Sequence, residues 1–163
     1  SYFSKFNNIW AHGDFASKSE NFGYVIHGRS DATLNAKGVR IGTAEIYRVV
    51  EEIAQVVESL AVAKEVDNDL KIILFVVLAG ENQLTPQLTQ EIVSRLRSNA
   101  SPRHIPDLIL QAPELPKTKS NKLVEIAVAD LINGRKVRNI DALSNPEALK
   151  WFSDLDFSSQ IWR

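Results

Sequence analysis

The stretch LKIILFVVLA, residues Leu70 to Ala79, decides the fold of this chain. Apart from one lysine it is a run of apolar and β-branched side chains without polar alternation, which predicts a strand buried on both faces. Residues 59–66 are also rich in β-branched side chains and predict a neighbouring strand. The two strands predict the centre of a small sheet, whose cover must come from other parts of the chain.

Four helices are predicted around these strands from apolar side chains at helical spacing and from capping residues. Thr43 has the character of an N-cap, and Thr85-Pro86 opens a helix with proline in its first turn. Asn133-Gly134 closes a third helix, and Ser144 has capping-box spacing with Glu147. The predicted helices cover residues 43–54, a segment from residue 85, residues 122–132 and a segment from residue 144.

Further strands are predicted on either side of this centre. Residues 23–27 and 108–110 have the composition of short strands, and residues 31–42 that of a hairpin with its turn at 35–38. The resulting order, β-β-α-β-β-α-β-α, describes a compact α+β unit in which a small sheet with a β-hairpin is flanked by helices. Residues 1–29 are rich in aromatic side chains, and so short a segment predicts a partner surface for them.

Composition limits the class of protein. The 163 residues, of which 44% are hydrophobic and 24% charged, suit one globular domain with a core and room for part of another. The formal net charge of -1 argues against nucleic acid and membrane surfaces as partners, so an anion would have to be bound locally. The absence of cysteine excludes disulfides and thiolate metal sites. Methionine is also absent, and we therefore expect a fragment of a longer protein.

A lysine-rich turn, PKTKSNK at residues 116–122, runs into the third predicted helix. We call these residues the lysine turn. A lysine at a helix start can present its ammonium, together with free backbone N–H groups, to a phosphate or carboxylate. Lys122 is therefore a candidate site residue. The alternative is a solvated lysine in a polar turn, which is the interpretation we keep for Lys117 and Lys119.

Two glycine–arginine segments are further candidates for anion binding, Gly28-Arg29-Ser30-Asp31 and Gly38-Val39-Arg40-Ile41-Gly42. Glycine lets the backbone approach a ligand, and arginine can bind phosphate in a bidentate manner. The two arginines could also pair with Asp31 and Glu45 on the surface. Asp14 could accept hydrogen bonds from a ribose diol or cap a turn. The three histidines show no metal-ligand spacing.

Three segments in this order resemble motifs of the acyl-adenylate-forming superfamily, which includes acyl-CoA synthetases, luciferases and peptide-synthetase adenylation domains. His12-Gly13-Asp14 resembles the Gly-Asp motif that closes the large N-terminal domain. Residues 28–46 resemble the hinge-and-hairpin motif, and the lysine turn resembles the Pro-x-Thr-x-Ser-Gly-Lys motif. Residues 101–106, 122–128 and 144–147 are most similar to the branch of ligases that join acetoacetate to CoA. The resemblance covers nearly the whole chain.

The resemblance implies an AMP-forming acid–thiol ligase of the cytoplasm that acts on ATP, CoA and a short acid such as acetoacetate. ATP and the acid would first give an acyl-adenylate and pyrophosphate, and CoA would then give the thioester and AMP after a domain rotation. Residues 1–30 would end the N-terminal domain, and residues 31–163 would form the mobile C-terminal domain with its tail. Magnesium, the acid pocket and most of the ATP site would lie on the missing N-terminal domain. We therefore expect the fragment to be inactive alone.

The resemblance also implies roles for single residues. Asp14 and Arg29 would bind the ribose of ATP, and Arg40 would contact its phosphates. Lys122 would be the catalytic residue of adenylation, where its ammonium stabilises the α-phosphate and the attacking carboxylate. The remaining roles are the hinge, at Asp31, and CoA binding, by Lys37, Gly38 and Arg97.

One residue departs from the motif, and two alternatives stay open. Asn121 stands where the superfamily has glycine; if the turn needs a positive φ, asparagine is the next most tolerant residue. The chain could belong to a ligase for a different short acid, because the residues that select the acid are absent. It could also be a stand-alone regulatory or binding module without chemistry of its own.

Overall fold

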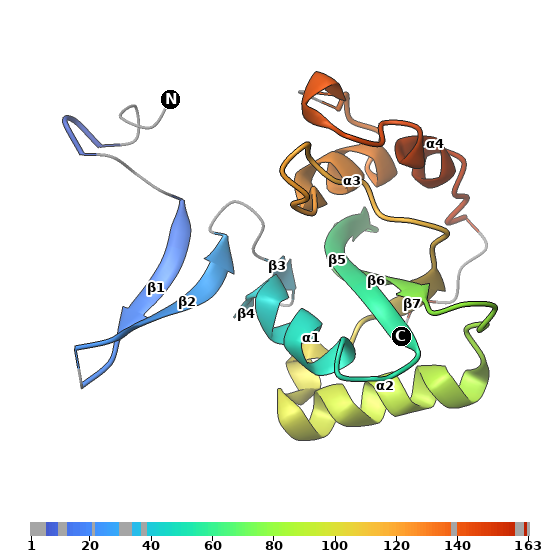
Figure 1. Cartoon of the computed structure of the whole chain (residues 1–163), viewed down its shortest axis with the longest axis horizontal. Coiled ribbons are helices and arrows are strands. Elements are labelled where there is room, and N and C mark those ends of the chain that lie inside the picture. Colours follow the sequence, from blue (N-terminus) through green and yellow to red (C-terminus); the bar gives the residue numbers. More distant parts are fainter. Residues whose placement is uncertain are drawn as a thin grey trace.

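The apolar stretch forms the central strand of a sheet in the computed structural model of the chain (Figure 1). Strand β6 (Asp69–Leu78) pairs antiparallel with β5 (Val56–Val66) and parallel with β7 (Leu108–Gln111). Leu74 lies opposite Ala61 on one side and Ile109 on the other. The structure describes residues 6–9, 13–20, 22–29, 34–36, 39–137, 140–158 and 162.

Helices cover both faces of this sheet (Figure 1). They are α1 (Thr43–Val50), α2 (Pro86–Asn99), α3 (Glu125–Ile132) and α4 (Ala148–Ser153), with short 3-10 helices η1 (Pro102–His104) and η2 (Ile140–Ala142).

Alternate side chains of β6 enter two separate cores. Ile72, Leu74 and Val76 are buried with the apolar side chains of α1 and α2. Ile73 and Phe75 point to the other face and are buried with those of α3 and α4. This arrangement confirms the predicted α+β fold and explains why the strand sequence lacks polar alternation.

Two of the predicted helix ends are confirmed, and both predicted ends of the first helix are wrong. The Thr85 hydroxyl accepts a hydrogen bond from Leu88 N at 3.2 Å and caps α2. Asn133 ends α3, and Gly134 follows with a φ of 68°. Thr43 is not the N-cap of α1: Gly42 is, and Thr43 is buried in the first helical turn. Helix α1 also ends at Val50 rather than at residue 54.

The predicted starts of the last two helices are wrong for a common reason. Helix α3 begins at Glu125 rather than at residue 122, because Leu123 forms an antiparallel bridge with Lys117. Helix α4 begins at Ala148, and the Ser144 hydroxyl donates to Lys117 O at 3.1 Å instead of capping the helix. In both cases Lys117 supplies the partner; it lies close to Leu123 in the sequence but 27 residues from Ser144.

Two short hairpins precede α1. Strands β3 (Leu34–Ala36) and β4 (Val39–Ile41) pair antiparallel as predicted. The turn predicted at residues 35–38 is partly wrong, because Asn35 and Ala36 belong to β3; residues 37 and 38 lie outside the described residues. Strands β1 (Asp14–Lys18) and β2 (Tyr24–Arg29) also pair antiparallel and extend from the body as an arm (Figure 1). We call residues 14–29 the N-terminal arm.

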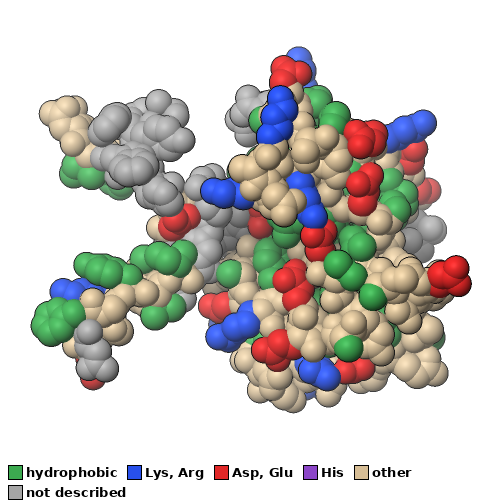
Figure 2. Space-filling model, viewed as in Figure 1, with side chains coloured by type: hydrophobic (Ala, Val, Ile, Leu, Met, Phe, Trp, Pro, Cys, Tyr) green, Lys and Arg blue, Asp and Glu red, His purple; other side chains and the backbone are tan. Residues whose placement is uncertain are grey.

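Apolar side chains are exposed along the N-terminal arm (Figure 2). Phe22 is 81% exposed and Tyr24 is 72% exposed, and Val25 and Ile26 are also exposed. This exposure agrees with the expectation that the aromatic N-terminal segment needs a partner surface. Among the residues that the structure describes, no helix has the length and apolar character that crossing a membrane requires.

Candidate functional site

The lysine turn has a first arm that contains Lys117 and Thr118 and a second arm that begins at Lys122. Hydrogen bonds between these two arms close the turn. Thr118 N donates to Lys122 O at 2.9 Å, and Lys122 N donates to Thr118 Oγ1 at 3.1 Å. The Lys122 side chain is exposed, and no residue in the described part of the chain forms a hydrogen bond or ion pair with its ammonium. The turn thus presents Lys122 to solvent from a hairpin and not from a helix start. The prediction that free N–H groups of a helix start bind an anion together with Lys122 is therefore wrong.

Asn121 occupies the position at which the turn reverses. Its φ is 59°, in the left-handed region, and its N–H donates to Thr118 O at 2.8 Å. Glycine tolerates this region because it has no Cβ, and asparagine because its short polar side chain can form local hydrogen bonds; most other residues are strained there. The turn therefore does need a positive φ at this position, and asparagine can replace the glycine of the motif there.

Replacing Asn121 by alanine is expected to lower the free energy of unfolding by about 1 kcal/mol, because alanine is strained at a positive φ. Replacing it by glycine is expected to change that free energy by less than about 0.5 kcal/mol. Urea unfolding of the two variants measures the difference. Equal losses in both would contradict backbone strain and indicate a lost side-chain contact.

Lys117 is not the solvated lysine that the sequence suggested. It is partly buried and its ammonium is paired with the carboxylate of Glu58, on β5. This ion pair fixes the first arm of the lysine turn to the edge of the sheet. Sequence analysis missed Glu58, since no local pattern joins two residues so far apart in the chain. Lys119, in contrast, is exposed, as expected.

The other candidate residues lie on several elements. Asp14 and Arg29 occupy paired backbone positions in the β1–β2 register. Arg40 is exposed on β4, and Arg97 is exposed in the last turn of α2. Three candidates lie outside the described residues: Asp31, Lys37 and Gly38.

His104 connects α1, which follows Arg40, with the start of η1, which follows Arg97. Its Nε2 lies 2.7 Å from Glu45 Oε2, on α1, and its Nδ1 lies 2.8 Å from Ser101 Oγ, just before η1. The side chain of His104 is 12% exposed. Glu45, one of the two carboxylates considered as an arginine partner, therefore contacts a histidine for which the sequence suggested no role.

Side chains of α1 and of its C-cap, Glu51, form hydrogen bonds with backbone groups along the outer edge of β5. Ser59 N and Ser59 Oγ each donate to Glu51 Oε1 at 2.9 Å. Tyr47 Oη accepts from Ala61 N at 3.1 Å and donates to Glu125 Oε1, on α3, at 3.2 Å. Tyr47 therefore links α1, β5 and the first turn of α3, which follows the lysine turn.

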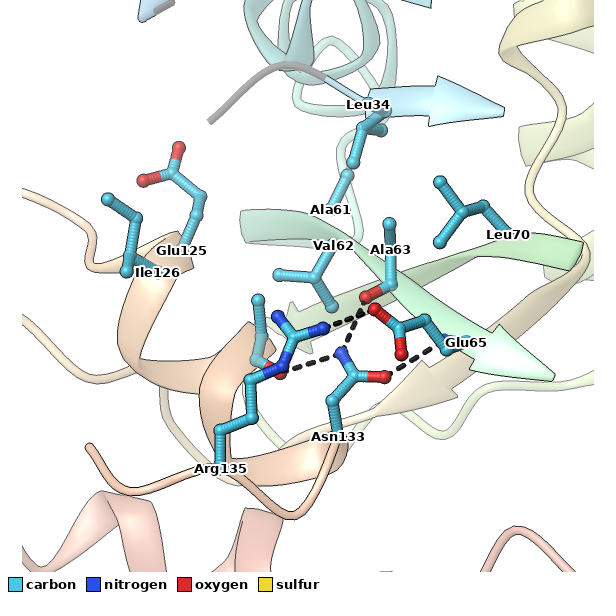
Figure 3. A pocket seen from close by; sticks show the side chains of 11 residues that line it. Leu34, Ala61, Val62, Ala63, Glu65, Leu70, Glu125, Ile126, Asn133 and Arg135 are labelled. Atoms are coloured by element: carbon cyan, nitrogen blue, oxygen red, sulfur yellow. Dashed lines mark hydrogen bonds and ion pairs between the residues drawn. The ribbon is translucent and has the colours of Figure 1, made fainter. Parts of the chain in front are cut away.

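Asn133 also forms hydrogen bonds with backbone groups of β5, near the other end of the strand. It accepts from Glu65 N at 2.8 Å and donates to Ala63 O at 3.0 Å. Figure 3 shows Asn133 beside Arg135, which is paired with Glu65, at one end of a cavity of about 160 Å³, with Glu125 at the other end. The small volume and the mutually satisfied polar groups suit a structural joint between β5 and α3 better than a substrate pocket.

The buried hydroxyl of Tyr47 makes stability depend on pH. Burial, and then the charge of Glu125, raise the pKa of Tyr47 far above its ordinary value of 10.0. The folded protein keeps this proton at a pH where the unfolded chain loses it, so the stabilisation is complete below about pH 10 and declines above it. We expect the free energy of unfolding to fall above about pH 10 by up to about 1.4 kcal/mol per pH unit.

Urea unfolding between about pH 8 and pH 11 measures this slope. Lysines also titrate in this range, so the informative quantity is the difference between the unmodified chain and the Tyr47→Phe variant. The variant should show the shallower decline. Parallel curves for the two proteins would contradict the assignment of the decline to Tyr47.

A larger cavity, of about 730 Å³, lies against the lysine turn. Thr118 lines one side of it, and Asp130 and Lys136 are also among its lining residues. Asp130 is buried, and its Oδ2 has no hydrogen-bond partner among the residues that the structure describes. Because Thr118 borders a cavity, hydrogen bonds and ion pairs contribute to the position of this part of the turn.

The described residues do not provide a metal site. No group of three or more His, Asp or Glu side chains in the described part of the chain lies close enough together to hold a metal ion. We therefore derive no step that involves magnesium from the residues of this segment.

Comparisons with known proteins agree with the resemblance seen in the sequence. No protein-family model matches the chain. It is 53% identical over 95% of its length to an acetoacetyl-coenzyme A synthetase of Rhizobium meliloti (strain 1021), and 42% identical over 93% to the acetoacetyl-CoA synthetase of Caenorhabditis elegans. It covers 24% and 22% of those proteins.

Among solved structures, the acetoacetyl-CoA synthetase from Streptomyces lividans matches with a TM-score of 0.85 and 35% identity. The match covers 94% of this chain and 23% of that protein. The chain thus spans about a quarter of the length of the relatives it matches, and both sequence and fold agree over that part. Over nearly its whole length, the chain is homologous to a segment that makes up about a quarter of the acetoacetyl-CoA synthetases.

Proposed function

We propose that this chain is the C-terminal part of an AMP-forming ligase of the cytoplasm that converts acetoacetate, ATP and CoA into acetoacetyl-CoA, AMP and pyrophosphate. The observation that carries the proposal is the identity to acetoacetyl-CoA synthetases over almost the entire chain. The lysine turn supports it, because the ammonium of Lys122 is exposed and available to a substrate held by another domain.

The proposed division of the chain is residues 1–30 as the end of the N-terminal domain and residues 31–163 as the mobile C-terminal domain. The exposed apolar side chains of the N-terminal arm support this division, because they suit packing against a larger body (Figure 2). The remaining three quarters of the relatives' length would supply the acid pocket, the magnesium site and most of the ATP site.

In the first half-reaction, the carboxylate of acetoacetate attacks the α-phosphorus of ATP and pyrophosphate leaves. The ammonium of Lys122 lies against the α-phosphate and the attacking carboxylate, where a positioned cation counters the charge that develops in the transition state. Asp14 and Arg29 hold the ribose hydroxyls, a role that their paired backbone positions on β1 and β2 support. Arg40 contacts the phosphates of ATP.

In the second half-reaction, the C-terminal domain has rotated about Asp31 and Lys122 has left the site. The thiol of CoA loses its proton and attacks the carbonyl carbon of the adenylate, and AMP leaves. Lys37, Gly38 and Arg97 contact CoA in this state. The exposed position of Arg97 at the end of α2 supports its part in this contact.

Turnover assays on the complete protein and on the 163-residue chain test the proposal. The complete protein should form acetoacetyl-CoA, AMP and pyrophosphate in equal amounts, and the chain alone should form none. Turnover by the chain alone would overturn the division into domains. Turnover only with a different short acid would favour the alternative ligase, and CoA binding without any turnover by the complete protein would favour a binding module.

A further inference from the structure

Residues 142–145 add a third backbone segment to the lysine turn. Lys119 N donates to Ala142 O at 3.1 Å, and Ser144 N donates to Lys117 O at 2.8 Å. Between these bonds, Thr118 and Leu143 form an antiparallel bridge. We call residues 142–145 the C-terminal staple. The first arm of the lysine turn is thus paired on one side with its own second arm and on the other with the staple.

Asn145 completes the staple with its side chain. Its Oδ1 accepts from Lys117 N at 2.8 Å, and its Nδ2 donates to Leu115 O and to Glu114 Oε2, each at 3.0 Å. One carboxamide therefore joins a donor and two acceptors in the segment that enters the turn. A side chain with only acceptors or only donors could not make all three bonds.

The staple is itself anchored in the protein core. Leu143 is buried together with Ala127 of α3 and Leu149 of α4. The same helix α4 places Phe152 against Phe75 in the centre of the sheet. A continuous series of packed groups therefore runs from the sheet through α4 to the staple, and from the staple to the lysine turn.

The staple and the ion pair act on the part of the turn that borders the larger cavity. Leu115 and Pro116, which lead into the turn, are buried, whereas Thr118, Ala142 and Leu143 line the cavity, so fewer packing contacts hold the turn at Thr118. The ion pair between Lys117 and Glu58 holds the turn from the sheet side, and the staple holds it from the other side.

We propose that Asn145 is a positioning residue for Lys122, acting through the C-terminal staple to hold the lysine turn in the geometry that adenylation needs. This inference rests on the proposed function of Lys122. Asn145 does not touch substrate; it fixes the backbone that carries the catalytic ammonium. Because a displacement of about 1 Å can cost about 10²-fold in rate, loss of the staple should act mainly on the half-reaction that uses Lys122.

The test uses the complete protein with Asn145→Ala, and with Gln90→Ala, an exposed carboxamide on α2, as the matched control. Acetoacetate-dependent exchange of pyrophosphate into ATP reports adenylate formation, and thioester formation from supplied acetoacetyl-adenylate reports the second step. Asn145→Ala should lower the first rate by about 10- to 100-fold and leave the second within about twofold. The control should alter neither, and equal loss of both rates in Asn145→Ala would overturn the proposal.

A double variant provides a rescue. Asn145→Asp keeps the acceptor for Lys117 N but loses both donations and places a carboxylate against Glu114. Adding Glu114→Gln supplies a donor to that carboxylate and should restore part of the lost adenylation rate. No gain in the double variant over Asn145→Asp would contradict a role for this hydrogen-bond network.

Hydrogen exchange separates failure of this inference from failure of the proposed function. In Asn145→Ala, the amides of Lys117 and Lys119 should exchange faster than in the unmodified protein, while those of the β5–β6 pair stay protected. Unchanged exchange at these two amides would refute the staple whatever Lys122 does. Faster exchange combined with no effect of Lys122→Ala on adenylation would instead refute the catalytic role of Lys122.

Discussion

Replacing Lys122 by alanine in the complete protein is expected to lower the rate of acetoacetyl-adenylate formation by about 10²–10³-fold. The ammonium acts where charge builds on the α-phosphate, so its loss removes stabilisation from the transition state more than from bound ATP. We therefore expect kcat for adenylation to fall while the KM for ATP changes little. Pyrophosphate exchange into ATP measures both quantities.

The matched control is Lys119→Ala, which removes an exposed lysine from the same turn. It should leave both half-reactions within about twofold, because it keeps the backbone and changes only the general charge of the turn. Thioester formation from supplied adenylate should also survive in Lys122→Ala. If that second step falls as far as the first, Lys122 does not act in adenylation alone and its assignment fails.

Replacing Phe152 by alanine is expected to lower the free energy of unfolding by about 3–5 kcal/mol. Phe152 is 1% exposed, and its ring contacts those of Phe75 and Trp151 edge to face, with centroids 4.9 and 5.0 Å apart. The truncation leaves a cavity at the point where α4 meets the sheet. Urea unfolding of the two proteins gives the difference.

Phe22→Ala is the control for this experiment, because Phe22 is 81% exposed on the N-terminal arm. It should change the free energy of unfolding by less than about 1 kcal/mol. A loss for Phe152→Ala no greater than that of the control would show that α4 does not pack on the sheet as described, and would also remove the anchor of the C-terminal staple.

Local patterns predicted those parts of the fold whose causes are local. The apolar run that became β6 and the capped start of α2 at Thr85 were predicted because burial on both faces and an N-cap leave marks within a few residues. The end of α3 at Asn133-Gly134 was predicted for the same reason.

The errors at the starts of the last two helices occur where another segment supplies the partner. Ser144 and Glu147 have capping-box spacing, yet the Ser144 hydroxyl binds Lys117 O, 27 residues away. Leu123 has an apolar side chain in a helical pattern, yet it pairs with Lys117 across the lysine turn. Single-sequence reasoning has no access to the hydrogen bond of Ser144, because this residue would look the same without its partner.

In the candidate site, too, features with local causes were predicted and features with remote partners were missed. Motif resemblance picked out Lys122, and positive-φ tolerance anticipated the geometry of Asn121. The supporting residues Glu58 and Asn145 were missed, since each acts on the lysine turn from a remote part of the chain. The Asn145-Pro146 dipeptide is a turn signal, but it does not say what the turn touches.

The side chains along the outer edge of β5 have a consequence for how the protein behaves in a crowded solution. An edge strand with unpaired amide groups is a template on which a second chain can add a strand and begin to aggregate. The outward N–H groups of Ser59, Ala61 and Glu65 are already bonded to side chains that lie in α1 or at the C-caps of α1 and α3. A foreign strand would have to displace Glu51, Tyr47 and Asn133 before it could dock, so the open edge of this small sheet is shielded from self-association.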